Sequence, residues 1–231
     1  MRGPLVAVRT TLGTVFSMTS NSDATNHLLE QAAGGDPRAL GALLTRHGDR
    51  LRRMVALRLD RRLQGRIDAS DVIQEAYLEA SARLTEYLGD PPMPFFLWLR
   101  FLTGQKLVTL HRHHLGVQMR AAGQEVALCR DALPEASSAA LAAGLLGHDT
   151  RPSEAAVRAE LRIRVQEGLN NMDPLDREVL ALRHFEQLSR AEIAQVLGVS
   201  EGAAGKRYIR ALERLKRILG HSPGGLGELL P

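Results

Sequence analysis

Basic side chains recur at helical spacing in EGAAGKRYIRALERLKRIL, the segment 201–219. They are Lys206, Arg207, Arg210, Arg214 and Arg217. Guanidinium and ammonium groups form charge-assisted hydrogen bonds with phosphates, and side chains near the start of a recognition helix also reach the base edges of DNA. The alternative is a bundle helix whose arginines lay their stems on apolar surface and keep their charges in water. The residues that precede this segment favour DNA binding.

A glycine turn and a second helix signal come directly before the basic segment, in SRAEIAQVLGVS, residues 189–200. Ser189 and Glu192 have the S-x-x-E spacing of a capping box ahead of an apolar run. Gly198 stands where a left-handed residue ends a helix, and Ser200 can cap the next one. Helix, short glycine turn and helix is the spacing of a helix-turn-helix. The DNA contacts predicted for it are Ser200, Glu201, Lys206, Arg207, Arg210 and Arg214.

A polar stripe is predicted in the first half of the chain, on the helix of IDASDVIQEAYLEASARL, residues 67–84. With about 100° per residue, Gln74, Glu75 and Leu78 fall on the same side as Asp71. The opposite, apolar side is predicted to face the core; it carries Ile73, Ala76, Tyr77, Ala80 and Leu84. A carboxylate at Asp71 alone is ordinary helix-start chemistry. The combination instead suits a protein partner that offers arginines.

Signals of catalysis and of metal binding are weak. The cluster HRHHL, residues 111–115, offers histidines without a cysteine or a well-placed carboxylate, so these side chains are expected to face phosphate or solvent. The sequence contains no phosphate-binding loop, no H-E-x-x-H and no nucleophile elbow. Cys129 is the single cysteine, which excludes an internal disulfide and fits a reducing cytoplasm. We expect no enzyme activity, no metal and no cofactor.

Composition favours helices throughout the 231 residues. Hydrophobic residues make up 44% and aromatic residues only 4%, while alanine, leucine, arginine and glutamate are abundant. No apolar run approaches the ~20 residues that cross a bilayer. A proline-rich break, LGDPPMPF at 88–95, separates the stripe helix from an apolar helix at 96–115. Small residues and weak periodicity at 116–152 favour a flexible linker over a short helix. The predicted fold is all-α, with two small helical domains joined by this linker and a helix-turn-helix in the second.

The second half resembles the C-terminal domain of bacterial extracytoplasmic-function sigma factors. The specific part is LSRAEIAQVLGVSEG, residues 188–202, followed by the basic helix. Two positions depart from the family pattern, which more often has a larger aliphatic residue at Ala204 and a polar or basic one at Gly205. A glycine inside this helix should cost about 1 kcal/mol relative to alanine.

The first half resembles sigma-factor domain two. ASDVIQEAYLEA, residues 69–80, is similar to the D-x-x-Q-E segment that docks on the clamp helices of the RNA polymerase β′ subunit, which implies that Asp71, Gln74, Glu75 and Leu78 bind core polymerase. PFFLWLRFLTGQKLVTLHRHHL, residues 94–115, is similar to the part that engages the minus-ten element, although Gln105 and Thr109 replace the usual asparagine and aspartate. The loop 89–95 would receive an unstacked base, and Trp98 and Phe101 are assigned to the core. The contacts implied with minus-ten DNA are Met93, Phe95, Lys106 and Arg112.

The sequence therefore predicts a cytoplasmic sigma factor that binds core RNA polymerase and directs promoter recognition and transcription initiation. The predicted divisions are a disordered leader at 1–25, domain two at 26–115, the linker at 116–152, domain four at 153–220 and a disordered tail at 221–231. Translation can start at Met1 or Met18. The family admits an anti-sigma factor as a further partner, beside core polymerase and promoter DNA. The alternative function is a helix-turn-helix regulator that never acts as a polymerase subunit.

Overall fold

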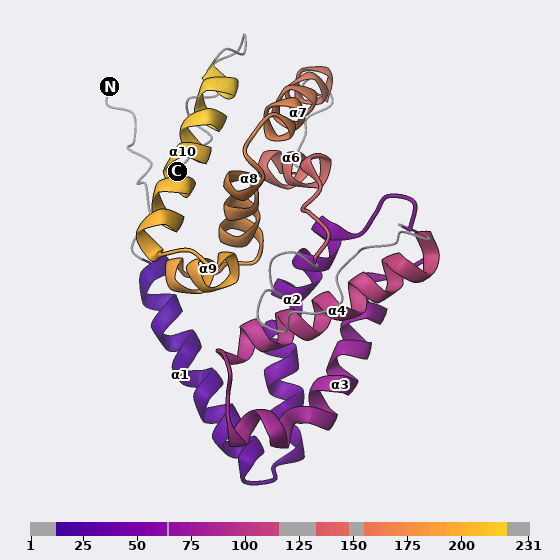
Figure 1. The fold of residues 1–231 in the computed structure, drawn as a ribbon, viewed down its shortest axis with the longest axis vertical. Helices are drawn as coiled ribbons and strands as arrows, with labels where there is room; N and C mark the ends of the chain where they lie inside the picture. The colour runs from indigo at the N-terminus through magenta and orange to yellow at the C-terminus, as the bar shows by residue number, and fades with distance from the viewer. Residues whose placement is uncertain (1–12, 64, 116–132, 148–154, 221–231) are drawn as a thin grey trace, which may run out of the picture.

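The computed structural model describes residues 13–63, 65–115, 133–147 and 155–220. The N-terminal domain consists of α1 (Gly13–Ala33), α2 (Pro37–Arg58), α3 (Ala69–Gly89) and α4 (Phe95–Leu115). The C-terminal domain consists of α6 (Ser138–Leu146), α7 (Ala155–Asn170), α8 (Pro174–Leu180), the π turn η2 (Ala181–Phe185), α9 (Arg190–Leu197) and α10 (Glu201–Gly220). Figure 1 shows the two groups of helices stacked along the long axis of the molecule. The all-α prediction is confirmed.

Side chains at the helix starts explain where the helices of the N-terminal domain begin. Asp36 precedes α2 and accepts a hydrogen bond of 2.8 Å from the Arg38 N–H, with proline as the first helical residue. Asp68 caps α3 as predicted and accepts a bond of 2.8 Å from the Ser70 N–H. The proline-rich segment separates α3 from α4, because proline lacks the N–H that a helix interior needs.

The helix-turn-helix prediction is confirmed in detail. Ser189 Oγ accepts a bond of 3.2 Å from the Glu192 N–H, while the Ser189 N–H donates over 2.7 Å to the Glu192 carboxylate. Gly198 ends α9 with φ at 62°, a left-handed conformation that glycine adopts at low cost. Ser200 then caps α10, because its Oγ accepts from the Ala203 N–H at 3.2 Å.

Two predicted boundaries are wrong. Helix α1 begins at Gly13, so residues 13–25 are helical rather than part of a disordered leader, and Thr25 is already buried. Residues 138–146 form α6 inside the predicted linker, and Leu141 is fully buried against the C-terminal domain. A nine-residue helix has little stability alone and forms because its apolar side packs on a neighbour. Three other predicted parts lie outside the described residues: the leader at 1–12, the linker at 116–132 and 148–152, and the tail from 221.

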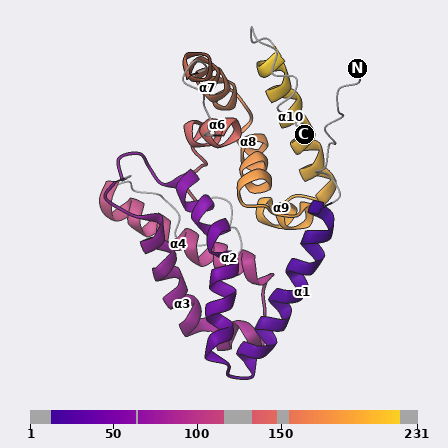
Figure 2. The same cartoon turned by 180° about the vertical axis from the view of Figure 1, so that it is seen from behind.

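The two domains are joined by a shared hydrophobic cluster instead of standing apart. A continuous cluster joins buried residues of α2, α3 and α4 to Leu182 and Leu188 and to the apolar side of α9. A hydrogen bond of 2.8 Å from the Ser137 N–H to the Leu57 carbonyl also connects the domains, at the C-terminal end of α2. The view from behind in Figure 2 shows α9 at the top of α1 and α8 above α2 and α4. Among the described residues, no helix is long and apolar enough to cross a membrane.

Candidate polymerase and promoter interfaces

The predicted polar stripe lies on the outer face of α3. Asp71, Gln74 and Glu75 are exposed, and Leu78 beside them is 67% exposed. The opposite face packs into the core through Ile73, Ala76 and Ala80, while Tyr77 and Leu84 are partly buried. The periodicity of the sequence therefore predicted both faces of this helix correctly.

The basic helix α10 carries two classes of cation. Lys206 is exposed in the second turn of the helix, and Ser200 and Glu201 are exposed at its start. Arg207 is largely buried, and its Nη1 lies 2.8 Å from the buried carboxylate of Asp176. Lys206 therefore faces solvent, whereas Arg207 forms an ion pair within the domain. The helical spacing of the sequence alone does not distinguish the two.

Arg210 and Arg214 lie one and two turns beyond Lys206 on α10. The Arg210 Nε lies 3.0 Å from Asp176, although most of the Arg210 side chain is exposed. Arg214 is half-buried. The helix also exposes Ile209, which is 57% accessible between these cations.

The structure corrects the assignment of Phe95 to a base-binding loop. Phe95 is only 3% exposed, and its ring packs against those of Tyr87, Trp98 and His47 at centroid distances of 5.5–5.8 Å. Such aromatic packing holds α4 against α3, and the Phe95 ring is not available to a base in this conformation. Trp98 belongs to the core as predicted. Met93 remains half-buried in the loop, and its carbonyl accepts a bond of 3.0 Å from the Tyr87 hydroxyl.

The cations of α4 also differ in their surroundings. Lys106 is partly exposed and forms an ion pair of 2.8 Å with Glu79 of α3, whereas Arg112 is exposed at the end of the helix. His111 was expected to face phosphate or solvent, but it is buried, and its Nε2 accepts a bond of 3.4 Å from the Asp60 N–H. Burial lowers the pKa of His111 below its ordinary value. His111 therefore supports the turn after α2.

Buried ion pairs join the two domains, and no pattern in the sequence predicts them. Glu186, which follows η2, is fully buried; its carboxylate lies 2.6 Å from Arg58 Nη1 of α2 and 2.6 Å from Arg100 Nε of α4. Arg58 also pairs with Glu178 of α8, and Arg100 Nη2 lies 3.7 Å from the same carboxylate. Burial would raise the pKa of Glu186, but the neighbouring guanidinium groups of Arg100 and Arg58 more than offset this, so its pKa is below the usual value.

Two further arginines of α2 bind the backbone at the same junction. Arg50 Nε donates to the Glu186 carbonyl at 2.8 Å, and Arg53 Nε donates to the Phe185 carbonyl at 2.7 Å. Gln187 has a left-handed backbone, with φ at 56°. Among the described residues no other non-glycine residue does. A π turn followed by a left-handed residue is costly and persists where the surroundings compensate for it. Here the arginines do so, by satisfying carbonyls that the helix leaves without partners.

Comparisons with known proteins match both halves of the chain. The family model described as sigma-70, region 4, matches residues 162–215, which include the helix-turn-helix. The RNA polymerase sigma factor CnrH of Cupriavidus metallidurans is 32% identical over 85% of this chain and 95% of its own length. The ECF RNA polymerase sigma factor SigD of Mycobacterium tuberculosis is 30% identical over 87% of this chain and 86% of its own. This chain belongs to the extracytoplasmic-function sigma factors.

The fold of this sigma factor is also similar to a solved structure, that of CnrH in complex with the cytosolic domain of CnrY. The TM-score is 0.50 with 26% identity, and the match covers 87% of this chain and 99% of CnrH. The similarity therefore extends over the N-terminal domain as well as over the region-4 match.

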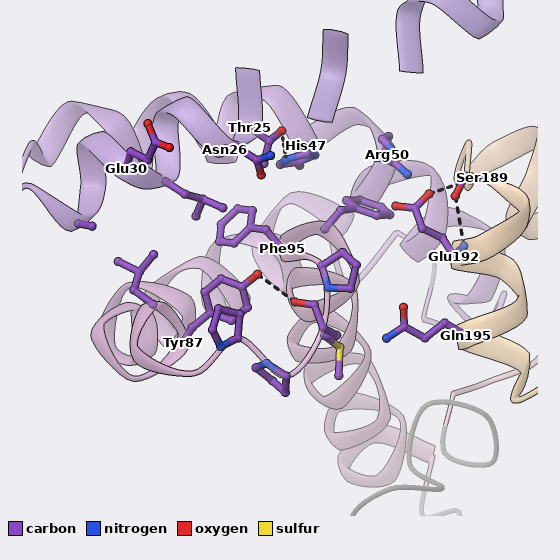
Figure 3. A pocket seen from close by; sticks show the side chains of 18 of the residues that line it. Thr25, Asn26, Glu30, His47, Arg50, Tyr87, Phe95, Ser189, Glu192 and Gln195 are labelled. Carbon is purple, nitrogen blue, oxygen red and sulfur yellow. Dashed lines mark hydrogen bonds between the residues drawn. The ribbon is translucent and has the colours of Figure 1, made fainter. Parts of the chain in front are cut away.

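A cleft of about 920 Å³ lies at the junction of this sigma factor's domains. Helix α1 and the segment from Pro91 to Phe96 line one part of it, and Ser189, Glu192 and Gln195 of the C-terminal domain line another. Figure 3 shows His47 and Arg50 between these parts, with Thr25 directed toward His47. Arg50 lies over the Phe96 ring, 3.5 Å from its centroid. The loop expected to receive a promoter base therefore opens into a space that the C-terminal domain partly closes.

Proposed function

We propose that this sigma factor docks on the clamp helices of core polymerase through the α3 stripe of Asp71, Gln74, Glu75 and Leu78. The gathering of all four exposed side chains on one face of α3 supports this assignment most directly, because an apolar side chain flanked by hydrogen-bonding groups combines the two kinds of contact found at protein interfaces. Charge-assisted bonds from the flanking carboxylates would fix the orientation of a partner that offers arginines.

Helices α9 and α10 are proposed to bind the upstream promoter element. The start of α10 presents Ser200, Glu201 and Lys206 to a major groove, and Arg210 and Arg214 follow along the helix. Arg207 is proposed to contribute mainly by holding α10 against α8, because its guanidinium is paired with Asp173 and Asp176. In the N-terminal domain, Met93, Lys106 and Arg112 are proposed to contact the downstream element.

Transcription in vitro with added core polymerase tests the function as a whole. We expect promoter-dependent RNA from the wild-type chain and core polymerase, and none from either alone. A chain that binds duplex DNA but never directs core polymerase would instead be a helix-turn-helix regulator.

A triple alanine variant tests the stripe. Replacement of Asp71, Gln74 and Glu75 should abolish capture by immobilised core polymerase and leave the helical circular dichroism unchanged. The matched control replaces Asp23, Glu30 and Gln31, which have the same side-chain types and are exposed on α1. Equal capture of both variants would reject the stripe as the docking surface.

The chain is proposed to act in the cytoplasm, as a polymerase subunit without catalytic activity of its own. CnrH was solved in complex with the cytosolic domain of CnrY. By analogy, we propose that an anti-sigma protein also binds this chain. Copurification of the tagged chain from its native cells, followed by mass spectrometry, would identify such a partner.

A further inference from the structure

The N-terminal domain presents a dense group of arginines toward the C-terminal domain, which we term the arginine face: Arg50, Arg53 and Arg58 of α2 and Arg100 of α4. From Arg50 to Arg58 the face extends along about 12 Å of helix, at 1.5 Å per residue. Glu178 and Glu186 form ion pairs with Arg58 and Arg100, whereas Arg50 and Arg53 bond to backbone carbonyls. The charge of a third carboxylate, Glu192, acts on Arg50, so four cations face three carboxylates. The face thus carries more positive charge than the opposing side chains neutralise.

The C-terminal domain covers the arginine face with an array of oxygen atoms. The carbonyls of residues 185–187 accept from Arg53 and Arg50, at distances of 2.7–3.2 Å. These carbonyls belong to the end of the α8–η2 helix, where the helix dipole is negative. Carboxylates and carbonyls together therefore present closely spaced acceptors with negative charge, which is also the chemistry of a phosphate backbone.

We propose that the arginine face is a binding surface for the phosphate backbone of DNA, and that the C-terminal domain occupies it in the closed chain. The planar guanidinium group matches phosphate and carboxylate oxygens equally well, so either acceptor satisfies the same N–H groups. Since Arg58 and Arg100 are almost completely buried, DNA and the C-terminal domain cannot bind them at the same time.

The position of the arginine face favours DNA over an acidic protein surface. Arg50 also lines the cleft formed by the proline-rich loop, which is proposed to lie at the downstream promoter element. The arginine face therefore continues the proposed DNA surface of the N-terminal domain. Separation of the domains would leave the four cations in water, with Arg50 beside that loop, and a nucleic-acid backbone is the polyanion that the proposed function supplies there.

Salt titrations of DNA binding by the full-length chain test the proposal without polymerase. Glu186→Gln removes one negative charge from the part of the C-terminal domain that covers the arginine face. The substitution should therefore favour separation of the two domains. Its affinity for a labelled duplex should rise about tenfold, and the slope of log K against log salt should steepen by 2–4, at about 0.9 per added phosphate contact. The control Glu167→Gln makes the same charge change at an exposed position of α7 and should alter affinity less than about twofold.

Further substitutions test whether the gain in DNA affinity comes from the arginine face. Adding Arg53→Gln and Arg100→Gln to Glu186→Gln should reverse most of the increase in slope. Adding Arg38→Gln and Arg52→Gln, which remove two exposed cations of α2, should reverse it much less. Equal effects of the two arginine pairs, or no gain from Glu186→Gln beyond that of Glu167→Gln, would overturn the proposal.

Photo-crosslinking of the wild-type chain provides a test that does not depend on the folding of variants. Promoter DNA carrying azidophenacyl groups on its phosphates would be bound to the chain with core polymerase, and crosslinked peptides located by mass spectrometry. Crosslinks in peptides that contain Arg53 or Arg100 are expected. Crosslinks confined to α10 and the end of α4 would reject the arginine face, whereas absence of promoter-dependent RNA would instead reject the proposed function.

Discussion

Arg100 and Glu186 form a hydrogen-bonded ion pair of 2.6 Å although 86 positions of sequence separate them, and neither side chain is more than 3% exposed. Burial of two charges is costly unless both are well paired, and removal of one partner typically costs about 3–5 kcal/mol. The pair therefore fixes one arrangement of the domains, while its polar character allows both partners to be hydrated after separation. An apolar contact of the same size would not have that second property.

Acid should destabilise the chain through His47. Burial, followed by the charges of Arg50 and Arg46, lowers the pKa of His47 from 6.5 to about 4. The unfolded chain takes up this proton as the pH falls below 6.5, whereas the folded chain resists until about pH 4, so stability is lost with falling pH across this window. The shift corresponds to roughly 3 kcal/mol, with a slope of up to about 1.4 kcal/mol per pH unit.

Urea unfolding between about pH 5 and 6.5, where glutamates stay mostly ionised, measures this slope. His47→Gln should remove most of it. His27→Gln, which changes an exposed histidine of α1, should leave it as in the wild type. Parallel slopes for wild type and His47→Gln would show that another group is responsible.

Leu78→Ala should weaken binding to core polymerase about tenfold, because roughly 1–2 kcal/mol of apolar burial is lost at the interface. The melting temperature should change little, since the side chain is 67% exposed. Ile163→Ala is the matched control, because Ile163 is another exposed aliphatic residue, at 58%, on α7 of the other domain. Surface plasmon resonance with immobilised core polymerase compares the two, and a larger loss for Ile163→Ala would move the main contact to the C-terminal domain.

Lys206 and Arg207 are adjacent but should respond differently to replacement. Lys206→Ala should weaken duplex binding and reduce the salt slope by about 0.9, with no loss of stability. Arg207→Ala should instead lower the free energy of unfolding by about 1–2 kcal/mol, because the buried Asp176 loses a charged partner at 2.8 Å. Fluorescence anisotropy and thermal unfolding separate the two effects. If Arg207→Ala affects only the salt slope, its guanidinium contacts phosphate directly.

Gly205→Ala should stabilise the chain by about 1 kcal/mol and raise the melting temperature by roughly 2–4 °C. A Cβ at this position would lie 3.7 Å or more from Arg190, which is ordinary contact. Gly144→Ala is the contrasting variant, because its Cβ would lie 2.2 Å from the Phe185 ring and should cost about 1–3 kcal/mol. Differential scanning calorimetry of both chains tests the pair, and a lower melting temperature for Gly205→Ala would mean that α10 needs glycine there.

Local patterns predicted α3, α9 and α10 well, because each helix has a capping residue and an apolar face at helical spacing. Phe95 was misassigned because it stands directly after the prolines, and only packing with Tyr87 and Trp98 shows that it begins the next helix. A flexible linker was preferred to a short helix at α6, because the small residues there give weak periodicity. The pairing of Arg100 with Glu186 has no local signal at all, since each residue alone looks like an ordinary charged surface position.

The shared hydrophobic cluster also limits how long an opened molecule can persist alone. Leu188, Val196 and Leu197 are buried in a cluster that includes both domains, and separation would expose part of that cluster to water. Contiguous apolar surface in water drives self-association of protein molecules. Opened copies would therefore self-associate at high concentration, and the closed form is the one expected to stay monomeric in concentrated solution.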